Sequence, residues 1–306
     1  MPITVLSVSL GSSKRDKRVE AELLGERVII ERRGTDGDLK KAIAMIAEYD
    51  GKVDAFGLGG IDLYLWLGTH KFVVRDALKM ARAAKVSAVV DGSGLKNTLE
   101  RRAVEWAAGD FAGEPRLVDS HALLMSAIDR TGMAETLYKY AKKVVFGDLA
   151  FALGVPIPIR SMGFLYFLGY TLLPIFTRLP FHLVYPVGEK QEVCTPKYPK
   201  LFEGAAWICG DFNYIKRYAP LDLTGRIILT NTTTEEDVAM LKSRGVKWLI
   251  TTTPVFDGRS FGTNLLEAVI VSLIKRDHGK DYKPTEADYD VYLNKLELKP
   301  TVRELT

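Results

Sequence analysis

The stretch from Val86 to Arg102, VSAVVDGSGLKNTLERR, constrains the fold more than any other part of this chain. Its first five residues are mostly apolar and rich in valine, as in a buried strand. Gly92 and Gly94 then mark a tight turn, and a helical pattern begins at Leu95. A strand that enters a helix through a glycine-rich turn directs free backbone N–H groups and the positive helix end at one point. The stretch therefore predicts an α/β fold with an anion-binding turn.

The same alternation of strands and helices recurs along the chain. Strands are expected at 3–10, 53–56, 117–118, 206–209, 226–229 and 246–250, hairpins at 18–32 and 63–74, and helices at about 36–49, 75–84, 121–130, 134–143, 234–244, 265–274 and 286–296. This order predicts an α/β protein made of two Rossmann-like or similar three-layer halves. We expect an N-terminal α/β domain with a hairpin start at 1–145, an apolar connecting segment at 146–187, a C-terminal α/β domain at 188–276 and a polar tail with a helix at 277–306.

The connecting segment is unusually apolar and rich in proline. Residues 161–177 carry no charge, and Arg160 and Arg178 flank them. A membrane-spanning helix needs about 20 apolar residues, whereas this run is shorter and contains Pro174. A helix buried between the halves or in a homo-oligomer interface is therefore favoured over contact with a membrane through 161–181.

Composition excludes several classes of protein. The chain has 42 basic and 38 acidic residues, a balance too mild for nucleic-acid binding. Cys194 and Cys209 are too few for a disulfide framework, and neither they nor the four histidines have the spacing of metal ligands. The first residues lack the basic start of a secretory signal. We therefore expect a cytoplasmic protein without a metal, and the abundance of Lys, Arg and Glu over Gln suggests a thermophilic source.

Five polar or glycine-rich loops follow predicted strands. They are 11–15, 57–62, 91–98, 230–234 and 251–264. Because ligands of open α/β sheets bind at the carboxyl ends of strands, we expect these loops to share one cleft. The candidate cofactor-binding residues are Gly57, Gly59, Gly60, Gly92, Ser93, Gly94 and Asn97, and the candidate substrate-binding residues are Lys14, Arg15, Arg259, Thr263 and Asn264. Each loop has a structural alternative, in which glycine serves the turn, Ser93 caps a helix and the charges are solvated.

Four phrases of the sequence carry a resemblance. SLGSSKRD (9–16), GLGGIDLYL (57–65), DGSGLKNTLER (91–101) and GRSFGTN (258–264) resemble a group of bacterial proteins labelled quinate 5-dehydrogenase. The resemblance implies oxidation of a hydroxyl of a cyclic polyol acid with NAD or NADP. The sequence lacks the NVT-x-P-x-K motif of shikimate dehydrogenases. Lys96 with Asp91 is instead the candidate catalytic pair, since polyol oxidation needs a base or relay at the hydroxyl.

The leading hypothesis is thus an NAD(P)-dependent oxidoreductase that acts on a small polyol or hydroxy acid. A second hypothesis is a phosphotransferase or nucleotide-binding protein of actin-like type, because the chain opens with a strand, a GSS loop, a hairpin, a helix and a strand. A third is a non-catalytic protein that docks to a membrane or partner through 164–181. Of the scattered histidines, His121 is the first to test for a catalytic role.

Overall fold

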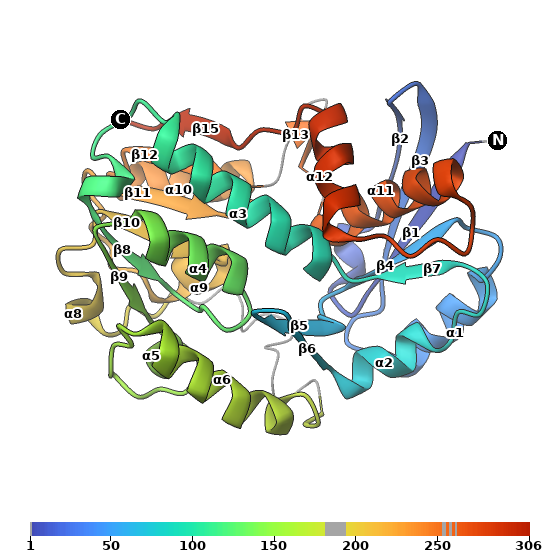
Figure 1. Ribbon diagram of the computed structural model, residues 1–306, viewed down its shortest axis with the longest axis horizontal. Coiled ribbons are helices and arrows are strands. Elements are labelled where there is room, and N and C mark those ends of the chain that lie inside the picture. The colour runs from blue at the N-terminus through green and yellow to red at the C-terminus, as the bar shows by residue number, and fades with distance from the viewer. Residues whose placement is uncertain (1, 181–193, 253–254, 257–258, 261) are drawn as a thin grey trace.

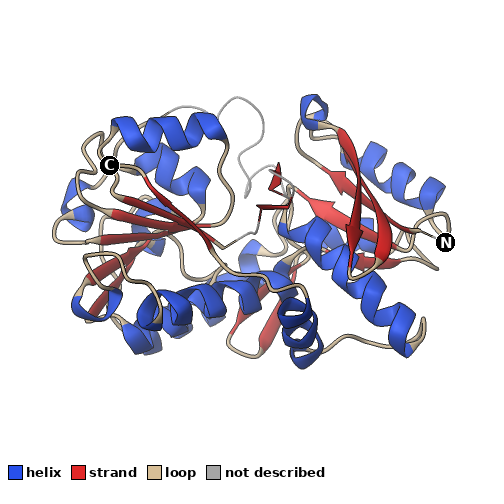
Figure 2. Cartoon of the chain, turned by 90° about the horizontal axis from the view of Figure 1, so that it is seen from above, coloured by secondary structure: helices blue, strands red, loops and turns tan. Residues whose placement is uncertain are grey.

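A computed structural model describes residues 2–180, 194–252, 255–256, 259–260 and 262–306, with the backbone alone at 255–256 and 259–260. The described chain forms two lobes, and each lobe is a mostly parallel sheet with helices on its faces (Figures 1 and 2). The predicted α/β class is confirmed. Among the helices that the described part contains, none is long and apolar enough to cross a membrane.

The first lobe is built on a five-stranded sheet in the order β2-β3-β1-β4-β7. Its strands are β1 (Ile3–Ser9), β2 (Lys17–Leu23), β3 (Glu26–Gly34), β4 (Ala55–Gly59) and β7 (Ala88–Val90), and only β2 is antiparallel to its neighbour. A short 3-10 turn, η1 (Ser13–Arg15), precedes β2. The helices of this lobe are α1 (Leu39–Tyr49), α2 (Arg75–Ala81), α11 (Thr263–His278) and α12 (Glu286–Lys295).

Alternation along β1 explains how these helices divide between the two faces of the sheet. Ile3 and Val5 belong to the same buried cluster as the apolar side of α11, while Leu6 and Val8 pack with Ile46 of α1. Successive strand residues point to opposite faces, so a continuous apolar run is required where both faces are covered. The first strand is therefore buried on both sides, as its composition predicts.

The second lobe is built on a six-stranded sheet in the order β15-β12-β11-β10-β8-β9. Its strands are β8 (His121–Leu124), β9 (Lys143–Phe146), β10 (Trp207–Gly210), β11 (Ile227–Thr230), β12 (Trp248–Thr251) and the antiparallel β15 (Thr301–Glu304). Its helices are α3 (Ser93–Gly109), η2 (Leu117–Asp119), α4 (Thr131–Tyr140), α5 (Asp148–Phe151), α6 (Met162–Phe176), α8 (Pro199–Phe202), α9 (Phe212–Tyr218) and α10 (Glu235–Ser243).

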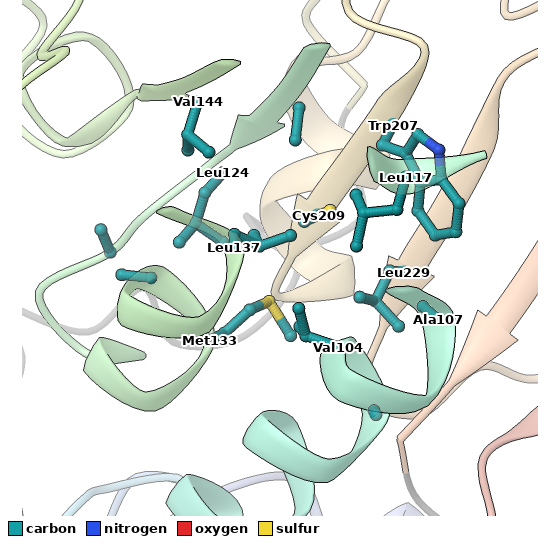
Figure 3. Close-up of a cluster of buried hydrophobic side chains, with 14 of the residues drawn as sticks. Val104, Ala107, Leu117, Leu124, Met133, Leu137, Val144, Trp207, Cys209 and Leu229 are labelled. Atoms are coloured by element: carbon teal, nitrogen blue, oxygen red, sulfur yellow. The ribbon is translucent and has the colours of Figure 1, made fainter. Parts of the chain in front are cut away.

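Figure 3 shows the core on one face of this sheet, where α3 and α4 contribute Val104, Met133 and Leu137. These side chains pack with Trp207 and Leu229 of the strands, and all five are fully buried. The opposite face is covered by a second cluster that includes residues of α5, α8, α9 and α10. The second lobe is therefore a three-layer unit with its own core.

The chain crosses between the lobes three times. It leaves the first lobe at α3, returns through β13 (Val255–Phe256), β14 (Arg259–Ser260) and α11, and leaves again after α12 for β15. The predicted boundaries need correction, because β8 and β9 belong to the second sheet, α3 packs against both lobes, and α11 and α12 belong to the first lobe. The apolar segment, described to residue 180, does not link two halves: α5 and α6 pack within the second lobe.

A small hairpin, β5 (Tyr64–Leu67) with β6 (His70–Val73), lies between the lobes beside α6 (Figure 1). Leu67 packs against Gly169 of α6, and the carbonyl of Trp66 accepts a hydrogen bond from the Thr131 hydroxyl at 3.0 Å. The hairpin at 63–74 was predicted and is confirmed by the β5–β6 pairing. The helix predicted at 121–130 was wrong, because its first four residues form β8, and the strand predicted at 117–118 is part of η2.

Candidate functional site

The carboxyl ends of the two sheets face each other. β12 ends at Thr251, from which the chain runs across to the first lobe and enters α11 (Figure 2). β8, β10 and β11 run parallel to β12, so their carboxyl ends point the same way. In the first lobe β7 ends at Val90, just before α3 crosses to the second lobe. Loops from both lobes are therefore brought to the boundary between them.

The order of the second sheet reverses between β8 and β10. The chain passes from β8 through α4 to β9 on one side, and later returns to β10 on the other side of β8. Ligands of open α/β sheets bind outside the carboxyl ends of the strands at such a point. A group of charged side chains gathers here, and we call it the interlobe site. It comprises Asp62, Lys96, Glu100, Asp129, Arg130 and Asp211.

Arg130 is the centre of the interlobe site. Its guanidinium pairs with Glu100 of α3 and lies 2.8 Å from the carboxylate of Asp211, which follows β10. The Arg130 side chain is 3% exposed and that of Glu100 is 1% exposed. Burial lowers the pKa of Arg130, but the carboxylates of Glu100, Asp211 and Asp129 outweigh it and raise the pKa above its ordinary value. A cation so deeply buried is stable only when carboxylates surround it.

Lys96 and Asp129 form the part of the interlobe site that solvent reaches. The Lys96 ammonium lies 3.5 Å from the Asp129 carboxylate, and the two side chains are 16% and 28% exposed. The Ser126 hydroxyl donates a hydrogen bond to the other oxygen of Asp129 at 2.7 Å. Burial and Arg130 lower the pKa of Lys96, but the carboxylates of Asp129, Asp62 and Glu100 raise it further. Despite burial, nearby charges lower the pKa of Asp129, so the pair is ionised, and part of each side chain remains accessible to solvent.

The interlobe site carries an excess of negative charge. Asp62, from the connection between β4 and β5 of the first lobe, raises the pKa of both Lys96 and Arg130 and so lies near them. Counting it, the site has four carboxylates and two cations. Within the described residues, Oε2 of Glu100 and Nε of Arg130 are buried without a hydrogen-bond partner. The site thus has unused polar atoms as well as ionised groups.

Asp148 supports the loop that carries these groups. One of its oxygens accepts hydrogen bonds from the amides of Ala127 and Ile128, at 2.8 and 2.9 Å. Burial raises the pKa of Asp148 to about 6, although these two hydrogen bonds work in the opposite direction. Asp148 therefore fixes the course of the backbone between Ser126 and Asp129.

The predicted anion-binding turn at the start of α3 is filled by carboxylates of the chain itself. Asp91 accepts hydrogen bonds from the amide and the hydroxyl of Ser93, at 3.1 and 2.7 Å. The carboxyl group of Glu267, on α11, lies against the amides of Gly92 and Leu95. Burial, and next the charge of Asp91, raise the pKa of Glu267 to about 8. The acceptors at this helix end are therefore internal: the carboxylate of Asp91 and the carboxyl group of Glu267, which is mostly protonated at neutral pH.

Asp91 and Lys96 do not form the predicted catalytic pair. The second oxygen of Asp91 accepts the amides of Leu63 and Tyr64, at 2.6 and 3.0 Å, so the carboxylate ties the β5–β6 hairpin to the end of β7. Lys96 faces Asp129 instead. The correction follows from geometry: Asp91 precedes the helix on the side of the first lobe, whereas Lys96 lies one turn inside it.

The predicted cofactor glycines make room for α11. A Cβ atom at Gly57 would lie 2.7 Å from the carbonyl oxygen of Asn264, and one at Gly92 would lie 2.7 Å from its amide nitrogen. At Gly94 a Cβ would lie 2.7 Å from a carboxyl oxygen of Glu267. The spacing that allows a phosphate to approach the backbone here allows the start of a helix to approach it. The prediction that these glycines bind a cofactor is therefore corrected.

Gly59 and Gly60 serve the first lobe in a similar way. A Cβ atom at Gly59 would lie 2.9 Å from the side chain of Ser9, and one at Gly60, where φ is +71°, would lie 3.1 Å from the Gly11 amide nitrogen. The chain continues from β4 into the β5–β6 hairpin and not into a helix. A dinucleotide fingerprint needs a helix directly after its glycines, so GLGG is a turn.

We expect Gly92→Ala to lower the free energy of unfolding by about 2–3 kcal/mol, because the new methyl group combines an unfavourable φ with a backbone clash. Gly92 has φ of +91° and the Asn264 amide nitrogen blocks the position of a Cβ. The matched control is Gly25→Ala, where φ is +77° but nothing lies within 4 Å. Urea denaturation of both variants measures the difference, and equal losses would show that α11 does not press on the turn.

The remaining predicted residues occupy separate places. Ser93 accepts the indole N–H of Trp66 at 3.2 Å, and Asn97 is buried where α3 meets α4. The side-chain amide of Asn264 donates a hydrogen bond to the Ser7 hydroxyl at 2.8 Å. Thr263 is the first residue of α11, Lys14 and Arg15 are exposed in η1, and the side chain of Arg259 lies outside the described part of the chain. Of the predicted residues, only Lys96 is in the interlobe site.

Comparison with solved structures gives alignments over almost the whole chain at low identity. A galactofuranose-binding protein is 12% identical, with 97% of this chain and 99% of that chain covered and a TM-score of 0.38. A periplasmic solute-binding protein of an ABC transporter from Actinobacillus succinogenes, with bound D-allose, is 11% identical, with coverages of 93% and 94% and a TM-score of 0.37. An NAD-dependent malic enzyme from Thermotoga maritima is 12% identical, with coverages of 97% and 83% and a TM-score of 0.37.

The predicted function needs correction. An NAD(P)-dependent oxidoreductase was expected because glycine turns seemed open to a dinucleotide, but α11 and Glu267 fill those turns. The actin-like alternative does not fit the strand order, because β1 and β3 pair in parallel and a hairpin follows β4. The alternative of a protein that docks through 164–181 stays a prediction.

A comparison with the curated proteins found no match. Two family models match consecutive parts of the chain, and the boundary between them falls at the Gly92 turn where the chain first leaves the first lobe. One, described as a domain of unknown function (DUF8753), matches residues 4–91. The other, described as a domain of unknown function (DUF8754), matches residues 94–305, which is more than half of the chain. The chain therefore belongs to the DUF8754 family, with the DUF8753 domain preceding it.

Proposed function

We propose that this protein binds a small polyhydroxylated molecule, of the sugar or polyol class, at the interlobe site. The observation that carries the proposal is the ionised Lys96–Asp129 pair, 3.5 Å apart and partly exposed, at the point where the strand order of the second sheet reverses. Arg130 contacts both Asp129 and Glu100, and the side chains of Arg130 and Glu100 are themselves buried. On the other side of the interlobe site, the first lobe supplies Asp62.

The chemistry of the pair suits neighbouring hydroxyl groups. A carboxylate accepts hydrogen bonds from two hydroxyls, and an ammonium group donates to their oxygens. Such hydrogen bonds are stronger than neutral ones because one partner is charged. Since Ser126 and Arg130 already fix Asp129, little side-chain freedom is lost when a ligand binds. A diol would therefore replace water at a site that is preorganised for it.

The charge of the interlobe site argues against an anionic ligand. The four carboxylates outnumber the two cations, and Arg130 is already shared between Glu100 and Asp211. A phosphate or carboxylate ligand would meet uncompensated negative charge in a region of low dielectric constant. The ligand is therefore neutral or carries an ammonium group, which distinguishes it from a nucleotide or a quinate-like acid.

Calorimetric titration tests the proposal with a panel of neutral sugars, polyols, amino sugars, sugar acids and sugar phosphates. We expect binding by members of the first three groups and none by the anions. Asp129→Asn removes the charge of the exposed carboxylate and should weaken binding at least tenfold, the loss of a charge-assisted hydrogen bond worth about 1.5–3 kcal/mol.

The matched control is Asp222→Asn, an exposed residue that bonds to Thr224 ahead of β11, at the opposite end of the sheet. The Asp222→Asn variant should bind the sugar or polyol with the affinity of the wild type. Binding of sugar phosphates in preference to neutral sugars, or an unchanged affinity in Asp129→Asn, would contradict the proposal. Circular dichroism establishes that both variants are folded.

A further inference from the structure

A pocket lies in the second lobe at the end of the sheet opposite to the interlobe site. Its walls include His121 and Lys143, which are the first residues of β8 and β9, so the pocket is at the amino ends of these strands. Its volume is about 520 Å³, within the range of small-molecule sites. We call it the basic pocket.

The charges of the basic pocket are nearly all positive. Lys143, Arg160 and Lys200 line it, and Glu203 is the one acidic residue of the lining. Where the structure describes the chain, none of these three cations forms an ion pair with another residue. Cations from three separate segments thus converge on one cavity, where Glu203 is the one carboxylate of the lining. This arrangement favours an anion from outside.

The walls of the basic pocket are largely apolar and held in place. Pro156 and Pro158 stand on one side, in the segment that pairs with the edge strand β9 through the bridge between Phe146 and Ile159. Tyr198 lines another side with φ of +55°, an unusual conformation for a residue other than glycine. Its hydroxyl donates to the carbonyl of Gly154 at 3.0 Å. A flat ring placed between the prolines and the tyrosine would bury apolar surface. Little side-chain entropy would be lost, because these walls are already held in place.

We propose that the basic pocket binds an organic anion in which a phosphate or carboxylate group is joined to a flat apolar body. The anionic group would face Lys143, Arg160 and Lys200, and the apolar body would lie along the prolines and Tyr198. This ligand class is the reverse of the neutral polyol proposed for the interlobe site. The two sites share no residue, so the inference does not depend on the proposed function.

The experiment uses phenyl phosphate as the probe, followed by calorimetry and by NMR of the full chain. We expect phenyl phosphate to bind, and the double variant Lys143→Gln/Lys200→Gln to bind it at least tenfold more weakly. Phenol and inorganic phosphate, each carrying one half of the probe, should bind at least tenfold more weakly to the wild type. Affinity should fall with rising salt concentration.

Asp129→Asn is the control, because it changes the interlobe site and should leave binding of phenyl phosphate unchanged. Both replaced lysines are exposed, so the double variant should fold as the wild type does. The proposal is overturned by equal binding of phenol and phenyl phosphate, by equal binding of inorganic phosphate, or by full affinity in the double variant. Loss of affinity in Asp129→Asn would place the probe at the wrong site and overturn it too.

Discussion

Replacing Arg130 by methionine should lower the free energy of unfolding by about 3–5 kcal/mol. The variant keeps the length of the side chain but removes the cation between Glu100 and Asp211. Glu100, only 1% exposed, is then left as a buried carboxylate without its partner. It must either remain charged at low dielectric or take up a proton, and both cost free energy. Urea denaturation at neutral pH measures the loss.

Arg303→Met is the control for this variant. Arg303 pairs with Glu235 at 2.8 Å, but the two side chains are 38% and 80% exposed, so the loss should be at most about 1 kcal/mol. Adding Glu100→Leu to Arg130→Met removes the stranded carboxylate and should restore part of the stability. If Arg130→Met is no less stable than Arg303→Met, the cluster at the interlobe site is not held together by charge.

The sequence allows prediction of most elements that have a clear local pattern. The hairpin over 18–32 was placed correctly because charged and apolar residues alternate along it, and its turn is formed by Leu24 and Gly25. The helix after Thr234 begins with the predicted capping box, in which Thr234 and Asp237 each bond to the other's backbone amide. These elements depend on neighbours in sequence, so their signals survive without tertiary information.

The loop that carries Asp129 and Arg130 was missed because β8 gives no strand signal. The strand His121–Leu124 has only four residues, and three of them are buried on a sheet covered on both faces. Such a run shows no alternation and cannot be told from a buried helix by its period. Once 121–130 is interpreted as a helix, no loop remains for Asp129 and Arg130. Asp211 was overlooked for another reason, since the strand at 206–209 was predicted but the residues after it were not among the five candidate loops.

The glycine turns show where sequence reasoning must stop. The pattern around Gly92 does predict a strand, a tight turn and a helix with an anion at its start, as the structure has it. The group that fills the turn depends on α11, which begins some 170 residues later along the chain and brings the carboxyl group of Glu267 to the turn. A glycine requires only close approach of another group, and the sequence does not distinguish a phosphate from the chain's own helix.

Glu267 should make the protein less stable as the pH rises through neutrality. Burial and the charge of Asp91 raise the pKa of Glu267 to about 8 in the folded protein, from 4.5 in the unfolded chain. Between these values the folded state binds the proton and the unfolded state does not, so the free energy of unfolding falls with rising pH. The contribution of Glu267 to the free energy of unfolding is therefore highest below about pH 4.5. It falls by about 5 kcal/mol in all by the time the pH exceeds about 8.

Urea denaturation at a series of pH values from 6 to 8 isolates this group. Asp148, whose pKa burial raises to about 6, acts in the same direction but mostly at lower pH. In this window the wild type should lose up to about 1.4 kcal/mol per pH unit more than Glu267→Gln, which keeps the shape of the side chain without the titration. Glu286→Gln, in the exposed first turn of α12, should keep the slope of the wild type. Equal slopes in the wild type and in Glu267→Gln would mean that Glu267 is ionised at the start of α3, and that the turn is occupied by a charged carboxylate and not by a protonated one.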